Sequence, residues 1–254
     1  MSDKELTREN SGDPLKTYLI LQLTAAQKQL RLIGPDGDIE ALHRFRVALR
    51  RFRSLLHTYA KALYAPDAVA KSMLSATNPL REIDVFFASL DNTAYPRLYA
   101  AVEKERRTLY RNRWTSDTVE RFEHALVRLS GDISRLAFES RTKKMLKRVD
   151  KLDARAKEAH ERLGANSPED AVHNVRLLYK QLRYALEFLS DAGLIDGRKK
   201  IKRVKKILEH FGAVQDAADQ LRWLENFCSA HPHDECGHLV KARKKQLKAL
   251  KKAF

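Results

Sequence analysis

A twelve-residue pattern occurs twice in this chain of 254 residues and limits the possible folds more than any other feature. Residues 42–53 read LHRFRVALRRFR, and residues 172–183, 130 positions later, read VHNVRLLYKQLR. In both copies apolar residues recur every three or four positions, which is the spacing of one face of an α-helix. A repeat of this kind predicts two related helical halves.

The two copies carry matching apolar and basic stripes. The apolar positions are Leu42, Phe45, Leu49, Phe52 and Leu56 in the first copy and Val172, Val175, Tyr179, Leu182 and Leu186 in the second. The basic and histidine positions are His43, Arg46, Arg50 and Arg53 in the first copy and His173, Arg176, Lys180 and Arg183 in the second. At about 100° per residue, each basic set fits an arc of about 80°. Because the apolar stripe must pack against other helices, we expect the cations to line a groove beside the packing seam.

The net charge favours an anionic partner. The chain has 49 Lys and Arg against 33 Asp and Glu, a formal charge of +16, and residues 141–254 carry +12 of it. A further helix is predicted to form a second wall of the groove with Arg198, Lys202, Lys205 and Lys206. Cations that repel one another along a helix cost stability unless an anion compensates them, and Arg and Lys suit phosphate oxygens. The plainer interpretation is a set of solvated helix faces with local ion pairs, for example between Arg183 and Glu187.

The fold class is predicted to be all-α. No segment alternates in the manner of a β-strand, and the prolines fall between stretches with helical spacing. Ser167 is predicted to cap a helix that begins at Pro168. The predicted helices cover residues 15–32, 39–63, 66–75, 79–90, 96–114, 118–138, 142–163, 168–191, 198–211, 213–230 and 235–252.

Several functional classes lack support in the sequence. No apolar run approaches the roughly 18 residues of a membrane span and the first residues are polar, so a cytoplasmic location is expected. Cys228 and Cys236 are too few for a disulfide framework, and no structural disulfide is expected. No glycine-rich phosphate loop occurs. His43 and His173 lack a nearby nucleophile, so we expect hydrogen-bonding or phosphate-contact roles for them and no catalytic residue.

Three other features each have two interpretations. Residues 231–238, HPHDECGH, contain the common zinc ligands, but their spacing matches no standard site and suits a connecting loop. No metal site and no cofactor are therefore predicted. The basic tail, residues 241–252, can contact nucleic acid or an anionic membrane surface, or it can dock on the other helices. Trp114 and Trp223 are expected in the core, not as platforms for stacked bases.

Four segments of the chain resemble the CHAD family, the histidine-containing α-helical domains associated with polyphosphate. They are HRFRV with RRFR in residues 43–53, LREIDV in residues 80–85, residues 173–187, and FGAVQD in residues 211–216. The resemblance implies two four-helix bundles related by a pseudo-twofold axis, residues 15–140 and 141–254, which together form one CHAD domain. It also implies a basic central cavity that accepts inorganic polyphosphate.

The predicted polyphosphate-binding set joins the stripe cations to Arg51 and Arg81 of the matching segments and to the cations near residue 198. It comprises His43, Arg46, Arg50, Arg51, Arg53, Arg81, His173, Arg176, Lys180, Arg183, Arg198, Lys202, Lys205 and Lys206. Two acids, Asp84 and Asp216, belong to the motif by resemblance. Because a carboxylate repels phosphate unless a metal intervenes, we expect them to cap a helix or to pair with a cation such as Arg81. Asn174 and Ala213 replace basic residues of the first half, so asymmetric binding is expected.

The sequence therefore favours a non-catalytic protein that binds inorganic polyphosphate or a similar phosphate polyanion. Binding of RNA through the same positive charge is the alternative. A metal-dependent polyphosphate hydrolase is less favoured. The preferred chain length, the oligomeric state and any protein partners stay open.

Overall fold

The computed structural model describes residues 13–60, 63–137, 141–164, 167–232 and 234–252. Within these residues the chain forms ten α-helices and no β-strand, which confirms the all-α prediction. The helices are α2 (Pro14–Leu30), α3 (Ile39–Tyr59), α4 (Tyr64–Ala76), α5 (Asn78–Ala88), α6 (Pro96–Arg113), α7 (Ser116–Arg135), α8 (Thr142–Glu161), α9 (Glu169–Asp191), α10 (Arg198–Ala230) and α11 (Asp234–Lys252).

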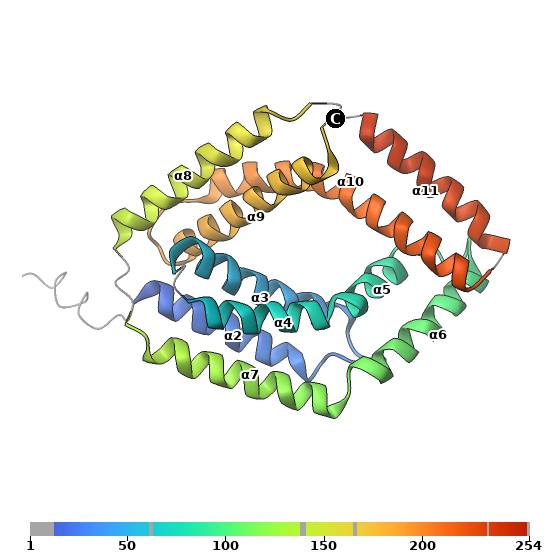
Figure 1. Ribbon diagram of the computed structural model, residues 1–254, viewed down its shortest axis with the longest axis horizontal. Coiled ribbons are helices and arrows are strands. Elements are labelled where there is room, and N and C mark those ends of the chain that lie inside the picture. Colours follow the sequence, from blue (N-terminus) through green and yellow to red (C-terminus); the bar gives the residue numbers. More distant parts are fainter. Residues whose placement is uncertain (1–12, 61–62, 138–140, 165–166, 233, 253–254) are drawn as a thin grey trace, which may run out of the picture.

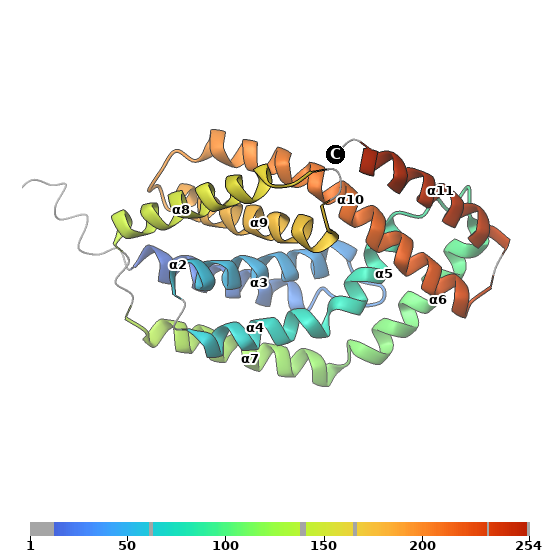
Figure 2. The ribbon, with the colours of Figure 1, turned by 45° about the horizontal axis from the view of Figure 1, so that its top comes forward.

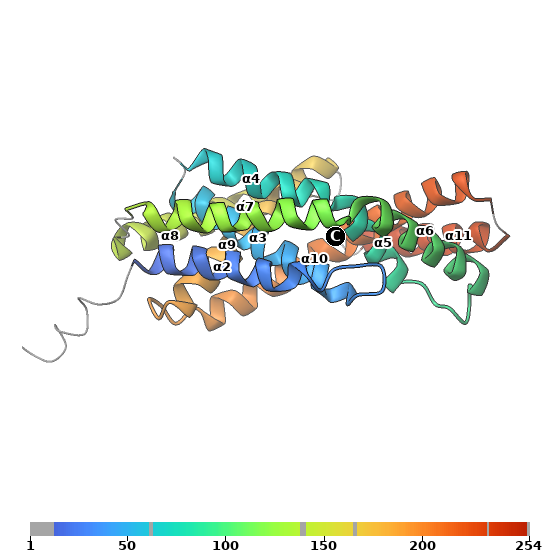
Figure 3. The same ribbon diagram turned by 90° about the horizontal axis from the view of Figure 1, so that it is seen from below.

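The helices form an elongated body in which the two copies of the repeat lie side by side. In Figures 1 and 2, α8, α9 and the first part of α10 lie along one long side, and α2, α3, α4 and α7 lie along the other. The helices α6 and α11 lie at one end of the body, which the view from below also shows (Figure 3). Because α3 packs directly against α9, segments 130 residues apart in the chain meet in the middle of the molecule.

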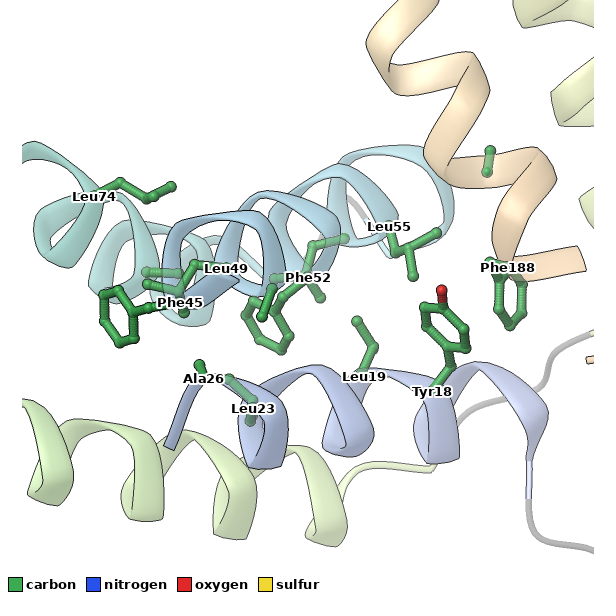
Figure 4. Packing of buried hydrophobic residues seen from close by; sticks show 14 of the residues in the cluster. Tyr18, Leu19, Leu23, Ala26, Phe45, Leu49, Phe52, Leu55, Leu74 and Phe188 are labelled. Carbon is green, nitrogen blue, oxygen red and sulfur yellow. The ribbon is translucent and has the colours of Figure 1, made fainter. Parts of the chain in front are cut away.

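The apolar stripes of both copies form the main core. All five apolar positions of the first copy and four of the second are at most 2% exposed, and the fifth, Val172, is half-buried against the same cluster. Leu19 and Leu23 of α2 face Phe45 and Phe52 of α3 (Figure 4). Burying one such side chain contributes about 1.5 to 3 kcal/mol relative to leaving it exposed. The predicted packing seam is therefore present in both halves.

A smaller core lies where α5, α6, the end of α10 and α11 meet. Trp223 packs there on Phe86 and Phe227, with ring centroids 4.3 and 5.1 Å apart. Trp114 packs in the main core against Phe122, at 5.7 Å. The prediction that both tryptophans belong to the core is thus confirmed.

A disulfide joins Cys228 near the end of α10 to Cys236 near the start of α11, so the expectation of no structural disulfide is wrong. The Cα atoms of the two cysteines are 5.9 Å apart. The expectation rested on the low number of cysteines, which says nothing about how close two cysteines lie. The tight connection between two packed helices brings them together.

Two predicted helix boundaries are also wrong. Residues 198–230 form the single helix α10 and not two helices, because a glycine inside a helix costs only about 1 kcal/mol relative to alanine. Gly212 is buried within it, beside the fully packed Phe211. Ser167 does not cap α9. Its hydroxyl oxygen accepts a hydrogen bond from the Gly164 amide at 2.9 Å, and Pro168 occupies the cap position.

The basic tail is part of α11, which packs on α10 and α6. Arg243 of the tail donates a hydrogen bond to the Ser89 carbonyl at 3.1 Å, so the tail docks on the other helices. Throughout the part of the chain that the structure describes, no helix combines the length and the apolar character that crossing a membrane requires. The same described residues contain no cluster of three or more side chains suited to hold a metal ion. Of the candidate zinc segment, His233 lies outside the described residues.

Candidate functional site

Two adjoining pockets open beside the α3–α9 seam. The larger has a volume of about 1100 Å³ and is bordered by α3, α4, the start of α5, α8 and α9. The smaller has a volume of about 610 Å³ and is bordered by α3, α5, the start of α9 and the middle of α10. Both are lined by Arg46, Arg50, Asn78 and His173. Because the two pockets share these lining residues, they lie next to each other, and we call them together the basin.

The basin brings together half of the predicted polyphosphate-binding residues. Those that line it are Arg46, Arg50, Arg53, Arg81, His173, Arg176 and Lys180. Those that line neither of its pockets are His43, Arg51, Arg183, Arg198, Lys202, Lys205 and Lys206. The stripes of both repeat copies therefore face one shared hollow, although not with every member.

Several cations of the basin have no anionic partner. Among the described residues, the side chains of Arg50, Arg81 and Lys180 make no ion pair and no hydrogen bond. Burial and the charges of Arg176 and Arg50 lower the pKa of the Lys180 amine from 10.5 to about 8. Partial loss of water around the guanidinium, together with the charges of Arg81 and Arg176, also lowers the pKa of Arg50. The residue as a whole nevertheless remains exposed. The positive charges of the basin therefore repel one another.

Arg46 differs from these cations because it is 4% exposed and bonded to the protein. Its guanidinium donates hydrogen bonds to the Leu74 carbonyl, the Thr77 hydroxyl and the Asn78 side-chain oxygen, at the junction of α4 and α5. All three acceptors are neutral, and Glu82 is a carboxylate that opposes the loss of the charge from a distance. Burial, followed by the charges of Arg50 and Arg81, lowers the pKa of Arg46 to about 9. Arg46 thus fixes the start of α5 and adds positive potential to the basin.

Other predicted residues are neutralised by ion pairs. Arg51 and Arg183 both pair with Glu187, at 3.2 and 3.7 Å, so the local pairing of Arg183 is confirmed. Arg53 donates two hydrogen bonds to Asp67, at 2.7 and 3.1 Å. A cation that already has a carboxylate partner attracts an additional anion less strongly. The unpaired cations therefore dominate the attraction of the basin for anions.

The predicted second wall is built from a later part of α10. Arg198 pairs with Asp196 at 3.0 Å, and Lys202, Lys205 and Lys206 are exposed outside both pockets. The lining residues of α10 lie one to two dozen positions further along the helix: Asp216, Asp219, Gln220, Arg222, Trp223 and Asn226. Because α10 continues through Gly212, its C-terminal half reaches the basin.

Four cations of the basin were not predicted: Lys71, Arg155, Arg162 and Arg222. Lys71 lies on α4, Arg155 on α8 and Arg222 on α10, and Arg162 directly follows the last residue of α8. The seven-residue spacing of Arg155 and Arg162 places both on one face of a helix and is a signal that could have been noticed. Lys71 stands alone on its helix, and nothing in its sequence context marks it.

The two acids of the motif differ in their surroundings. Asp84 is fully buried and accepts hydrogen bonds from Arg106 and Tyr110, both at 2.7 Å, so its partner is not Arg81. Asp216 lines the smaller pocket and pairs with Arg176 at 3.3 Å. Both carboxylates therefore pair with an arginine, as expected of structural acids.

The basin is polarised along its length. Among the described residues that line the larger pocket, the only carboxylate belongs to Glu158, which pairs with Arg162. The smaller pocket is lined by three carboxylates, those of Glu82, Asp216 and Asp219. The larger pocket is thus the more strongly positive end, and it is the end better suited to a phosphate polyanion.

Comparison with known proteins identifies the fold. The chain is similar to the crystal structure of the CHAD domain from the plant Ricinus communis, with a TM-score of 0.73 and 21% identity over 93% of this chain and 84% of that one. It is also similar to PptA from Streptomyces chartreusis, with a TM-score of 0.68 and 19% identity over 96% and 97% of the two chains. A comparison with curated proteins found no significant match. The model of the CHAD domain matches residues 17–225, and the chain therefore belongs to the CHAD domain family.

Proposed function

We propose that this protein binds inorganic polyphosphate in the basin and does not cleave it. The observation that carries the proposal is a group of cations, Arg50, Arg81 and Lys180, that have no partner among the described residues and line two adjoining pockets on helices from both halves. The association of CHAD domains with polyphosphate supports the same ligand.

The chemistry of the lining suits a repeated phosphate chain. Arginine donates paired hydrogen bonds to two oxygens of one phosphate, and lysine adds a mobile point charge. A polyanion that runs along the larger pocket meets cations from α3, α4, α8 and α9. A bound anion offsets the repulsion between the cations of the basin, and this attraction is the physical source of the proposed affinity.

We also propose that residues 15–140 and 141–254 are two four-helix bundles derived by duplication. The burial of equivalent apolar positions on α3 and α9, and the shared basin beside them, support this relation. The two halves would then bind the polyanion asymmetrically, because Asn174 and Ala213 stand where the first half has basic residues.

Retention of labelled polyphosphate by the purified protein at moderate salt tests the function. Salt dependence alone does not separate polyphosphate from RNA, since both ligands release counterions on binding. Competition does separate them: long-chain polyphosphate is expected to displace RNA at a lower phosphate concentration than the reverse. Displacement in the opposite order would favour an RNA-binding protein.

Analysis of polyphosphate chain length after incubation with Mg²⁺ or Mn²⁺ tests the absence of cleavage. We expect the chain-length distribution to stay unchanged at all protein concentrations that give complete binding. Progressive shortening would contradict the non-catalytic proposal and favour the hydrolase.

The affinity for polyphosphate is expected to fall at alkaline pH. Lys180, with a pKa of about 8 beside Arg50 and Arg176, is partly neutral in the free protein at that pH. A bound polyanion stabilises the ammonium form, so binding above pH 8 requires uptake of a proton and weakens by up to about tenfold per pH unit. Fluorescence anisotropy between pH 7 and 9.5 measures this. Lys180→Arg, which stays charged, is expected to flatten the profile, and an equally steep profile in that variant would contradict the assignment.

Lys180→Met is expected to stabilise the ligand-free protein by about 1 to 2 kcal/mol at pH 7, because it removes a buried charge among like charges. Folding lowers the pKa of Lys180 from 10.5 to about 8. The Lys180 charge therefore destabilises the folded protein to its full extent below pH 8 and no longer does so above pH 10.5. Urea unfolding at pH 7 and pH 10 measures the gain, which should be smaller at pH 10. Lys71→Met, at an exposed position of the same pocket, is the control with no expected gain. A loss of stability at pH 7 in the Lys180 variant would contradict the charge argument.

A further inference from the structure

Lys180 has three features that are not found together in the other cations of the described basin. Its amine lines the larger pocket, its side chain is half-buried, and it makes no ion pair and no hydrogen bond among the described residues. Lys71, the other lysine that lines the described basin, is exposed. An amine without a partner in an anion-attracting pocket is a nucleophile as well as a charge.

We propose that the Lys180 amine is a site of covalent acylation by small acyl phosphates. Arg50 and Arg176 are the cations whose charges act most strongly on Lys180, and both line the same pocket. They offer hydrogen bonds to the phosphate of the donor, which would hold its acyl carbon beside the amine. The proposal uses the anion-attracting basin but does not require that polyphosphate binds there.

The reaction at Lys180 needs no further reactant. The neutral amine attacks the carbonyl carbon of the acyl phosphate, and a carbon–nitrogen bond forms. The bond from that carbon to the bridging oxygen breaks, and inorganic phosphate leaves with the electron pair. The nitrogen then releases a proton to solvent, and the product is an amide.

The low pKa of Lys180 makes the amine available near neutral pH. At pH 7.5 an amine with a pKa of about 8 has a neutral fraction on the order of a hundredfold larger than one at the usual 10.5. Part of this advantage is lost because nucleophilicity falls with basicity. Burial, followed by the charges of Arg176, Arg50 and Arg183, lowers the pKa of Lys180, and the Asp216 carboxylate opposes this shift.

Acylation of Lys180 would act as a switch on the basin. It removes one positive charge and adds bulk where the cations are most crowded, so polyphosphate affinity should fall. Lys180→Gln, which mimics the amide, is expected to bind polyphosphate at least about tenfold more weakly than the unchanged protein, while Lys180→Arg retains binding.

The test is incubation of the full chain with acetyl phosphate at pH 7.5, followed by mass spectrometry of each lysine-containing peptide. Lys180 is expected to be acetylated at least about tenfold faster than Lys71 in the same pocket and Lys241 on α11. Arg50→Gln is expected to slow the reaction at Lys180, since it removes a phosphate contact and a charge that lowers the pKa. Lys180 reacting no faster than Lys71 would overturn the proposal.

An uncharged acetyl donor, N-acetoxysuccinimide, separates positioning from reactivity. The preference for Lys180 should shrink with this donor because no phosphate is held by the arginines, and an undiminished preference would overturn the positioning role. Polyphosphate binding is measured separately on unmodified protein. If polyphosphate binds but Lys180 is not selectively acetylated, the acylation proposal is refuted and the proposed function stands. If Lys180 is selectively acetylated but polyphosphate neither binds nor protects it, the proposed function is refuted and the acylation proposal stands.

Discussion

Reversal of charge at both Arg50 and Lys180 to glutamate is expected to weaken polyphosphate binding by at least about a hundredfold, which corresponds to roughly 2.7 kcal/mol. Neither side chain has a partner within the described part of the chain, and both line the larger pocket, one from each copy of the repeat. The double variant replaces two attractive charges by two repulsive ones at the centre of the proposed site. Anisotropy of labelled polyphosphate at fixed salt measures the loss.

A matched control distinguishes a groove from diffuse attraction. Lys241 and Lys248 lie exposed on α11, outside the basin, and their reversal to glutamate changes the net charge by the same amount. We expect the control to reduce affinity by less than about threefold at 0.15 M salt, because exposed charges beyond a Debye length are screened. Equal losses in the two variants would refute a localised site. Circular dichroism of both variants checks that the helices remain folded.

The fold could largely be predicted because its signals are local. The period of apolar residues in residues 42–53 and 172–183 specifies both a helix and its buried face, and the structure buries that face in each copy. Helix ends were less predictable. Gly212 looked like a boundary, but tertiary packing around Phe211 outweighs the small cost of a glycine and keeps α10 continuous.

The site could be predicted where a cation borders the core stripe and, for Arg81, through the family resemblance. Arg50, Arg176 and Lys180 were found in this way, since the position on the helix also determines the side that faces the seam. Whether a cation is free depends on contacts between helices, which the pattern does not contain. Arg51 of α3 pairs with Glu187 of α9 across 136 positions of the sequence, and this pair neutralises it.

The remaining lining residues come from long-range geometry. Lys71 and Arg222 reach the basin because α4 and α10 cross near α3 and α9, and no local pattern marks them. The disulfide between Cys228 and Cys236 has the same origin, since a tight connection between packed helices creates it. Composition alone therefore could not indicate these features.

The ion pair between Asp84 of α5 and Arg106 of α6 is the most deeply buried charge pair among the described residues, with side chains 0% and 6% exposed. The Asp84 carboxylate also accepts a hydrogen bond from the Tyr110 hydroxyl, and Arg106 donates a second hydrogen bond to the Pro35 carbonyl at 2.8 Å. This network holds α5 against α6. Because α5 also carries Arg81, the network positions one wall of the basin.

Asp84→Leu is expected to destabilise the protein by about 3 to 5 kcal/mol, because it leaves the guanidinium of Arg106 buried without its carboxylate. The double variant Asp84→Leu with Arg106→Met is expected to recover most of this loss, since an apolar pair replaces the ion pair in a similar volume. Urea unfolding of the single and double variants completes a double-mutant cycle. Exposed Asp150→Leu, on α8, is the control and should change the unfolding free energy by less than about 0.5 kcal/mol. If the double variant were as unstable as the sum of its single changes, uncompensated burial of Arg106 would not be the cause.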